Sequence, residues 1–184
     1  MKYLALILAI FPLFFSCSGP SGANQTEVAH EKMQVLNTDS LYEMAIMAYE
    51  NQDYTLAIQH FDALLNTDSS VADAWHDRGL CHYMLENYEK AEFDIQTSMK
   101  LDSTYAPGWL QLGLIYRKEN QANKALKAIE RSLDLDSSLA EAWFEAGALF
   151  MDQGKVNEAC FRFQKAANLG FDPAKKAINR FCNE

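Results

Sequence analysis

The stretch "WHDRGLCHYMLENYEKAEFD", which begins at Trp75, holds the densest group of potentially reactive side chains in the sequence. The group comprises His76, Asp77, Arg78, Cys81 and His82. Histidine, cysteine and aspartate are side chains that bind Zn²⁺ and that act as general acids and bases. At 100° per residue of helix, however, the five side chains fall on different faces, so three ligands do not converge. Neither Cys-x2-Cys nor His-Glu-x2-His spacing is present, and we expect no metal or acid/base site here.

The other histidines do not indicate a catalytic centre either. His30 and His60 have no spacing to the remaining two that would form a ligand set or an acid/base pair. We therefore expect a protein that is not an enzyme and that needs no cofactor. The alternative from a different functional class is an enzyme whose site the sequence does not reveal.

The composition is that of a folded, acidic and helix-rich protein. Of 184 residues, 49% are hydrophobic and 22% are charged, which is ordinary for a chain with a real core. Eight glycines and four prolines leave room for few tight turns. The formal net charge of −9 repels phosphate backbones, so a nucleic-acid partner is not expected.

The beginning of the chain, "MKYLALILAIFPLFFSCSG", is predicted to be a secretion signal. Lys2 precedes an apolar run from Leu4 to Phe15. This run is shorter than the ~18 apolar residues that cross a bilayer, so a transmembrane helix is not expected. We predict that residues 1–16 form the signal peptide.

The end of this run, "LFFSC", resembles the lipobox of bacterial lipoproteins, in which a cysteine becomes the acylated N-terminus after cleavage. The resemblance implies lipidation of Cys17, although Phe14 and Phe15 depart from the residues usual in that motif. Residues 17–37 would then be the lipidated cysteine and a tether, because "SGPSGANQ" is small, polar and uncharged.

The implied location is the bacterial cell envelope. Ser18 directly after the cysteine, with no aspartate, resembles sorting to the outer membrane, with the protein facing the periplasm. The lipid would be the only contact with the membrane. The alternative is an ordinary signal peptide with a chance cysteine, which would give a secreted adaptor without a lipid.

From about residue 38 the sequence repeats itself every 34 residues. The repeated positions are Trp75, Trp109 and Trp143, then Gly79, Gly113 and Gly147, then Ala91, Ala125 and Ala159. The pattern W-x2-L-G-x2-Y followed by A-x3-F resembles the tetratricopeptide repeat, and "WLQLGLIYRKENQANKALKAI" is its clearest copy. The resemblance implies an all-α fold, an α-solenoid of four tandem helix hairpins with a C-terminal capping helix.

The repeat gives the boundaries of the predicted units. They span residues 38–71, 72–105, 106–139 and 140–173, and the capping helix spans 174–184. Gly113 and Ala125 lack bulk, so the two helices of that unit are expected to approach closely. Ser103 and Ser137 replace the family's proline in "LDSTYA" and "LDSSLA", where we expect Asp-Ser to provide an N-cap for the next helix.

Arg78 occupies the position that Leu112 holds one repeat later, which is a core position. A charge there needs a partner. The resemblance to "RG…D" pairs in tetratricopeptide units points to Asp94, so we predict a structural ion pair. His82 is expected to pack inside the same hairpin.

The first helix of each unit lines a concave groove in this family, and the resemblance implies which side chains face it. They are Tyr42, Ile46 and Tyr49; His76, Leu80 and Tyr83; Leu110, Leu114 and Arg117; Phe144, Ala148 and Met151. The stripe recurs at i, i+4, i+7 and is mostly apolar, so we expect it to bind an apolar helix or an extended peptide. The basic and asparagine residues that clamp a carboxylate in chaperone-binding relatives are absent, because Tyr42, Ile46 and Asp77 hold those places.

The apolar stripe could instead serve the chain itself, in two ways. Part of it could pack only against neighbouring units. It could also pack against the chain's own "TEVAHEKMQVL", in which Val28, Met33 and Leu36 would form an apolar face.

Cys81, Cys160 and Cys182 remain after lipidation of the first cysteine. Cys160 and Cys182 lie at similar distances on either side of a turn near Gly170, so antiparallel helices would bring them together. "NEAC…NLG…RFC" also resembles a recurrent ending of bacterial tetratricopeptide proteins. The alternatives are a disulfide that pins the capping helix and two buried thiols.

Taken together, the resemblances predict a lipid-anchored scaffold or adaptor that binds other envelope proteins in its groove. The partner itself does not follow from the fold.

Overall fold

A computed structural model describes residues 38–182, and every regular element among them is an α-helix. The helices are residues 38–50, α2 Tyr54–Thr67, α3 Ala72–Met84, α4 Tyr88–Leu101, α5 Ala106–Lys118, α6 Ala122–Leu135, α7 Ala140–Asp152, α8 Val156–Asn168 and α9 Asp172–Phe181. The predicted signal peptide, Cys17 and the tether lie outside the described residues. The all-α repeat fold with a C-terminal helix is thus confirmed.

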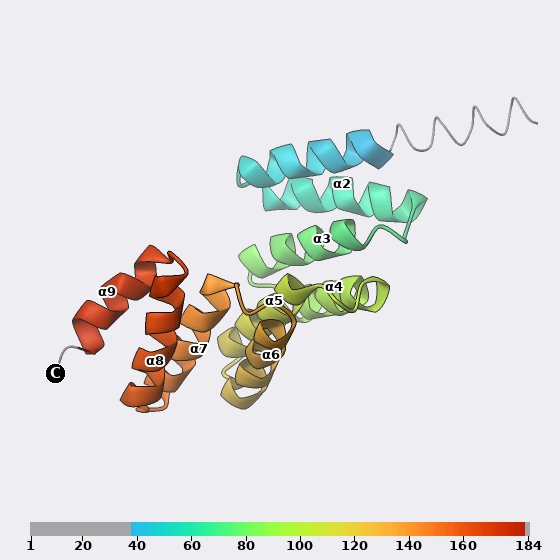
Figure 1. Cartoon of the computed structure of the whole chain (residues 1–184). Helices are drawn as coiled ribbons and strands as arrows, with labels where there is room; N and C mark the ends of the chain where they lie inside the picture. The colour runs from blue at the N-terminus through green and yellow to red at the C-terminus, as the bar shows by residue number, and fades with distance from the viewer. Residues whose placement is uncertain (1–37, 183–184) are drawn as a thin grey trace, which may run out of the picture.

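The helices form hairpins that follow one another in chain order, from the blue end to the red end of Figure 1. Within a hairpin α3 packs on α4, α5 on α6 and α7 on α8. Between hairpins the second helix of one unit packs on the first helix of the next, as α4 does on α5. Each unit therefore buries its uncovered face against its neighbours in sequence, which is how repeat arrays gain stability.

The first helices lie on the inner side of the array. α3 contacts α5, and α5 contacts α7, whereas no two successive second helices make a comparable contact within residues 38–182. We call the surface made by residues 38–50, α3, α5 and α7 the inner face, and the surface made by the second helices the outer face.

Small residues set the distance between the helices of a hairpin. A Cβ atom added to Gly113 would overlap Ile129 and come within 3.2 Å of the Ala125 carbonyl oxygen. Gly79 faces Ile95 and Gly147 faces Phe163 in the same way. The repeated glycine is needed because another backbone and a branched or aromatic side chain approach it closely.

Gly113→Ala is expected to lower the free energy of unfolding by about 1–3 kcal/mol, because the added methyl group overpacks the α5–α6 interface. Gly108→Ala on the same helix is the control, since there a Cβ would meet the flexible Met99 side chain and alanine has the higher helix propensity. Urea denaturation followed by circular dichroism measures both. A Gly113→Ala protein as stable as the wild type would show that the interface is not closely packed.

The Asp-Ser motifs do not cap the following helix, contrary to the prediction. Asp102 is the C-cap of α4, and its carboxylate accepts hydrogen bonds from the Thr104 amide and hydroxyl at 2.9 and 2.7 Å. α5 begins only at Ala106, so its N-cap is Tyr105, which makes no side-chain capping bond. The aspartate lies three residues too early and closes a local turn instead.

The C-terminal helix begins slightly earlier than predicted. α9 starts at Asp172, with Pro173 in its first turn, where a missing amide hydrogen costs nothing. Its packing against α8 buries Ala174 fully and Ile178 in part. α9 thus covers the last hairpin with a small apolar contact.

Candidate functional site: the inner face

Most side chains of the predicted groove lie half-buried on the inner face. They are Tyr42, Ile46, Tyr49, Leu80, Tyr83, Leu114, Arg117, Phe144, Ala148 and Met151. Neighbouring helices hold several of the rings. Tyr49 packs edge-on against Tyr54 of α2, and Tyr83 packs against Tyr88 of α4, with ring centroids 5.5 and 5.8 Å apart. Because both rings are fixed by the second helix, they offer a partner apolar area at little cost in side-chain entropy.

Two residues predicted to line the groove do not. His76 is only 7% exposed and Leu110 only 4%. The ring of Tyr105, which comes from the α4–α5 loop, packs edge-on over His76 at 5.0 Å. Leu110 belongs to the same buried cluster as Ala142 of α7, whose small side chain lets α5 and α7 approach.

Polar contacts link the first two units across the inner face. The Tyr42 hydroxyl donates to Asp77 Oδ2 at 2.6 Å, and His76 Nδ1 lies 3.1 Å from Asp77 Oδ1. Burial raises the pKa of Tyr42, and the hydrogen bond to Asp77 raises it further. The tyrosine therefore stays a neutral donor, and one carboxylate ties the first helix to α3.

A second polar contact links the last two units. Arg117 of α5 donates to the Glu145 carboxylate of α7, and its other terminal nitrogen lies 3.6 Å from Asp152. Burial raises the pKa of Glu145, while the Arg117 charge opposes this shift. The inner face is thus not purely apolar, because carboxylates alternate with its aromatic and aliphatic residues.

The family assignment rests on the repeat units themselves. Two tetratricopeptide repeat models match the sequence, one over residues 42–100 and one over residues 106–139. Together they span more than half of the chain. The chain belongs to the tetratricopeptide repeat family.

Solved tetratricopeptide structures share the fold. MamA superposes with a TM-score of 0.68 at 22% identity, covering 82% of this chain and 86% of MamA. YrrB, described as having an unusual peptide-binding site, superposes with a TM-score of 0.62 at 22% identity, covering 80% of this chain and 74% of YrrB. The first tetratricopeptide domain of Spaghetti (RPAP3), bound to the HSP90 peptide SRMEEVD, superposes with a TM-score of 0.62 at 19% identity. The match covers 65% of this chain and 94% of that domain. No curated protein sequence matches the chain.

In the second tetratricopeptide unit, Arg78 and Asp94 form a bidentate pair. Arg78 Nε donates to Asp94 Oδ2 at 2.8 Å, and its Nη2 donates to Oδ1 at 2.7 Å. Its Nη1 also donates to Asp62 of the preceding unit at 2.6 Å, and the guanidinium lies 4.7 Å from the Trp75 ring. Sequence reasoning missed Asp62, whose only signal is its place beside Phe61 on the preceding second helix. The pair joins two units as well as two helices.

His82 lies inside this hairpin, with Nε2 at 3.9 Å from Asp94. Burial lowers the pKa of His82 below its usual value, although the Asp94 charge opposes the shift. The unfolded chain therefore binds a proton near pH 6.5 that the folded chain does not bind.

Folding stability is expected to fall as the pH drops through 6.5 toward the lower pKa of folded His82, because the proton favours the unfolded state. His82→Gln should flatten this part of the curve. The measurement is the free energy of unfolding in urea at pH 7.5, 6.5 and 5.5. An equal loss of stability in both proteins would assign the dependence to other groups.

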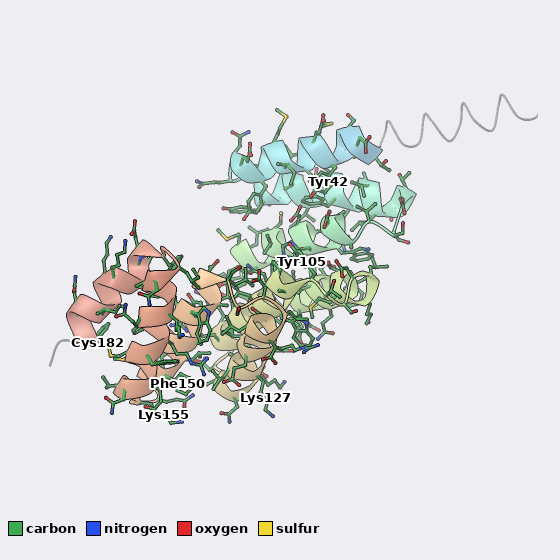
Figure 2. The ribbon with its side chains drawn as sticks, viewed as in Figure 1. Tyr42, Tyr105, Lys127, Phe150, Lys155 and Cys182 are labelled. Atoms are coloured by element: carbon green, nitrogen blue, oxygen red, sulfur yellow. A yellow bond between two sulfur atoms is a disulfide. The ribbon has the colours of Figure 1, made fainter. Side chains whose placement is uncertain are left out.

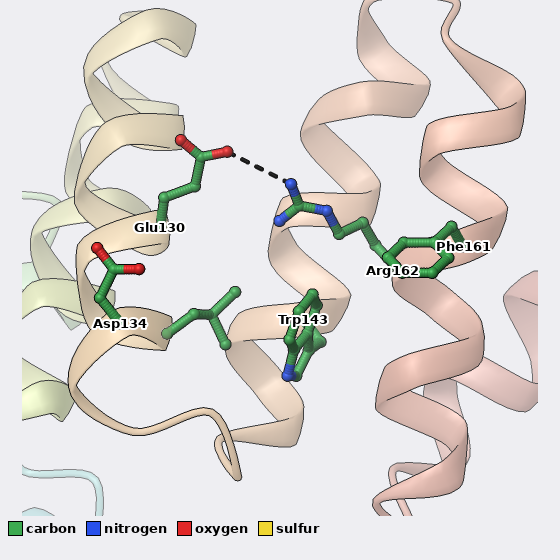
Figure 3. Close-up of a pocket in the computed structure, with 6 residues that line it drawn as sticks. Glu130, Asp134, Trp143, Phe161 and Arg162 are labelled. Atoms are coloured by element: carbon green, nitrogen blue, oxygen red, sulfur yellow. Dashed lines mark hydrogen bonds and ion pairs between the residues drawn. The ribbon is translucent and has the colours of Figure 1, made fainter.

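An outer-face cleft of about 400 Å³ lies between α6, α7 and α8 (Figure 3). Arg162 crosses it, donating to Glu130 at 3.3 Å while its guanidinium lies 5.4 Å from the Trp143 ring. One of the two carboxylates in the cleft, Glu130, thus pairs with its arginine, as Asp62 pairs with Arg78 between the first two units.

The cysteines fall into two groups. Cys160 of α8 and Cys182, the C-cap of α9, are joined by a disulfide, with Cα atoms 5.7 Å apart (Figure 2). Cys81 is a free, fully buried thiol, and burial raises its pKa to about 12. It therefore acts as a small apolar residue of the α3 core.

Within residues 38–182, the structure holds neither a metal site nor a membrane span. No group of three or more histidine, cysteine or acidic side chains in that part is arranged to hold a metal ion. None of its helices is long and apolar enough to cross a membrane.

Proposed function

We propose that this tetratricopeptide protein is a lipid-anchored scaffold of the bacterial cell envelope, which holds an apolar helix or extended segment of another envelope protein on its inner face. The tetratricopeptide fold itself indicates a protein–protein interaction scaffold. The observation that carries the finer proposal is the row of half-buried aromatic and aliphatic side chains on four successive first helices. A row of this kind suits a partner that inserts side chains at regular spacing.

The solved relatives support a peptide segment as the ligand. YrrB is described with a peptide-binding site, and the RPAP3 domain is bound to a peptide. That peptide, SRMEEVD, ends in acidic residues, whereas the inner face here carries carboxylates of its own, such as Asp77 and Glu145. The partner is therefore expected to differ from an acidic chaperone tail.

The anchor and the location are supported by the N-terminal sequence. An apolar run that ends at Cys17 suits a lipoprotein signal, and the polar residues after it suit a tether. The disulfide between Cys160 and Cys182 suits an oxidising compartment.

The anchor is tested by growing cells with alkyne-labelled palmitate. The wild-type protein is expected to carry the label and to sediment with membranes, whereas Cys17→Ser should lose both properties. A soluble, unlabelled wild-type protein would instead indicate the secreted adaptor without a lipid.

The binding surface is tested by pairing Tyr83→Ala with Leu114→Ala and crosslinking the protein in its native envelope. The double variant is expected to lose most of the crosslinked partner. The outer-face pair Phe93→Ala and Phe161→Ala is the matched control, because both rings are more than half exposed on second helices. If only the outer-face pair lost the partner, the inner-face proposal would be wrong.

A further inference from the structure

The two halves of the repeat array carry very different charges. Residues 38–105, the first two units, contain thirteen acidic and three basic residues, a formal net charge of −10. Residues 106–173, the last two units, contain nine acidic and eight basic residues, a net charge of −1. The protein's net negative charge therefore comes from the first two units.

On the inner face this charge surrounds one cluster of aromatic side chains. Asp77 lies between Tyr42 and His76, and Tyr105 packs on His76. The exposed Asp73 is near enough to raise the pKa of both Tyr42 and Tyr105. Figure 2 labels the two tyrosines, one on the first helix and the other in the α4–α5 loop.

The histidine in this cluster holds the Asp77 carboxylate in place. A carboxylate can only accept, so the 3.1 Å contact with Asp77 requires the proton on His76 Nδ1. His76 itself is only 7% exposed and its Nε2 is buried, so the ring positions Asp77 and does not reach the surface. The cluster thus offers a partner carboxylate oxygens and tyrosine ring faces, both of which suit a cationic N–H donor.

The fourth unit shows what is missing here. Glu141 and Glu145 stand at the repeat positions of Asp73 and Asp77, 68 residues later. There the preceding unit supplies the cation, because Arg117 pairs with Glu145. At the position of Arg117 the first unit has Tyr49, and no lysine or arginine within residues 38–182 pairs with Asp73 or Asp77.

The basic residues of the first two units do not reach the cluster. Arg78 turns to Asp94 and Asp62, away from the inner face. Lys90 and Lys100 belong to α4, a second helix. Asp73 and Asp77 therefore lack the cation that Arg117 provides to Glu145 in the last two units.

We propose that this acidic cluster of the first two units binds a lysine or arginine side chain of the partner segment held on the inner face. The inference rests on the proposed function and names the chemistry of the partner there. The cation would lie between Asp73 and Asp77 over the tyrosine rings, in the place that Arg117 fills in the last two units. The apolar residues of the partner would contact the rest of the row.

The test uses the mature chain in detergent and two acetylated peptides, Leu-Lys-Ala-Leu-Lys-Leu-amide and the same peptide with glutamine in place of lysine. In isothermal titration calorimetry, the lysine peptide is expected to bind about three- to tenfold more tightly than the glutamine peptide. A difference of this size suits one or two partly exposed ion pairs. Raising the salt concentration should reduce the difference. Asp73→Asn with Asp77→Asn should abolish it, and asparagine still accepts the Tyr42 hydrogen bond.

Glu141→Gln with Glu145→Gln is the matched control and should keep the preference for lysine. Asp73 is exposed and forms no ion pair within residues 38–182, so Asp73→Asn alone changes the charge without disturbing the fold. This variant should lose part of the preference for the lysine peptide. Equal binding of the two peptides by the wild type would overturn this inference and leave the groove intact. Binding of neither peptide would contradict the groove as well, and loss of the preference only in the Glu141/Glu145 variant would place the cation in the other half.

Discussion

Replacing Arg78 with leucine is expected to lower the free energy of unfolding by about 3–5 kcal/mol, because Asp94 then stays buried without its cation. The Asp94 side chain is only 2% exposed and receives two hydrogen bonds from the guanidinium. Asp62, the other partner, is 51% exposed and water can solvate it. The cost therefore comes almost entirely from Asp94.

The double variant Arg78→Leu with Asp94→Leu should be more stable than Arg78→Leu alone, since it removes the uncompensated charge as well. Urea denaturation of the wild type, both single variants and the double variant gives the coupling energy directly. Arg162→Leu is the control. Its partner Glu130 is 46% exposed, so loss of this ion pair should lower the free energy of unfolding by less than about 1 kcal/mol. Equal stability of the single and double variants would mean that Asp94 is not an unpaired buried charge.

The fold was predictable because its signal is local and repeated. Tryptophan, glycine and alanine return every 34 residues, and α3, α5 and α7 begin at residues 72, 106 and 140, where the predicted units begin. Each of the three repeated glycines, Gly79, Gly113 and Gly147, meets a bulky residue of its own hairpin, so one repeat is enough to account for the spacing. Where a single residue decided the detail, as Asp102 did in the turn after α4, the prediction of an N-cap was wrong.

The inner face was predictable only in part, because burial and pairing there depend on contacts between units. His76 is covered by Tyr105, a loop residue 29 positions later that the groove pattern did not include. The Tyr42 bond to Asp77 spans 35 residues. Helical periodicity tells which side chains share a face, but not which of them the next unit covers.

Removing the disulfide is the second large effect we expect. Cys160→Ser with Cys182→Ser should lower the free energy of unfolding by about 3 kcal/mol, because the bond closes a loop of 22 residues in the unfolded chain. The loss should centre on α9, which has Ala174 as its one fully buried residue. Hydrogen exchange of the wild type with and without dithiothreitol should therefore show that reduction accelerates exchange more in α9 than in α5.

Counting thiols provides the control for that experiment. Of the cysteines in residues 38–182, only Cys81 should react with iodoacetamide in the unfolded, unreduced chain, and reduction should add two. In the folded chain at pH 8 Cys81 should stay unreactive, because it is fully buried and its pKa is about 12. Three reactive thiols without reductant, or equal stability with and without dithiothreitol, would show that α9 is held by packing alone. Cys81→Ala should keep the dependence on reductant, since the buried thiol takes no part in holding the helix.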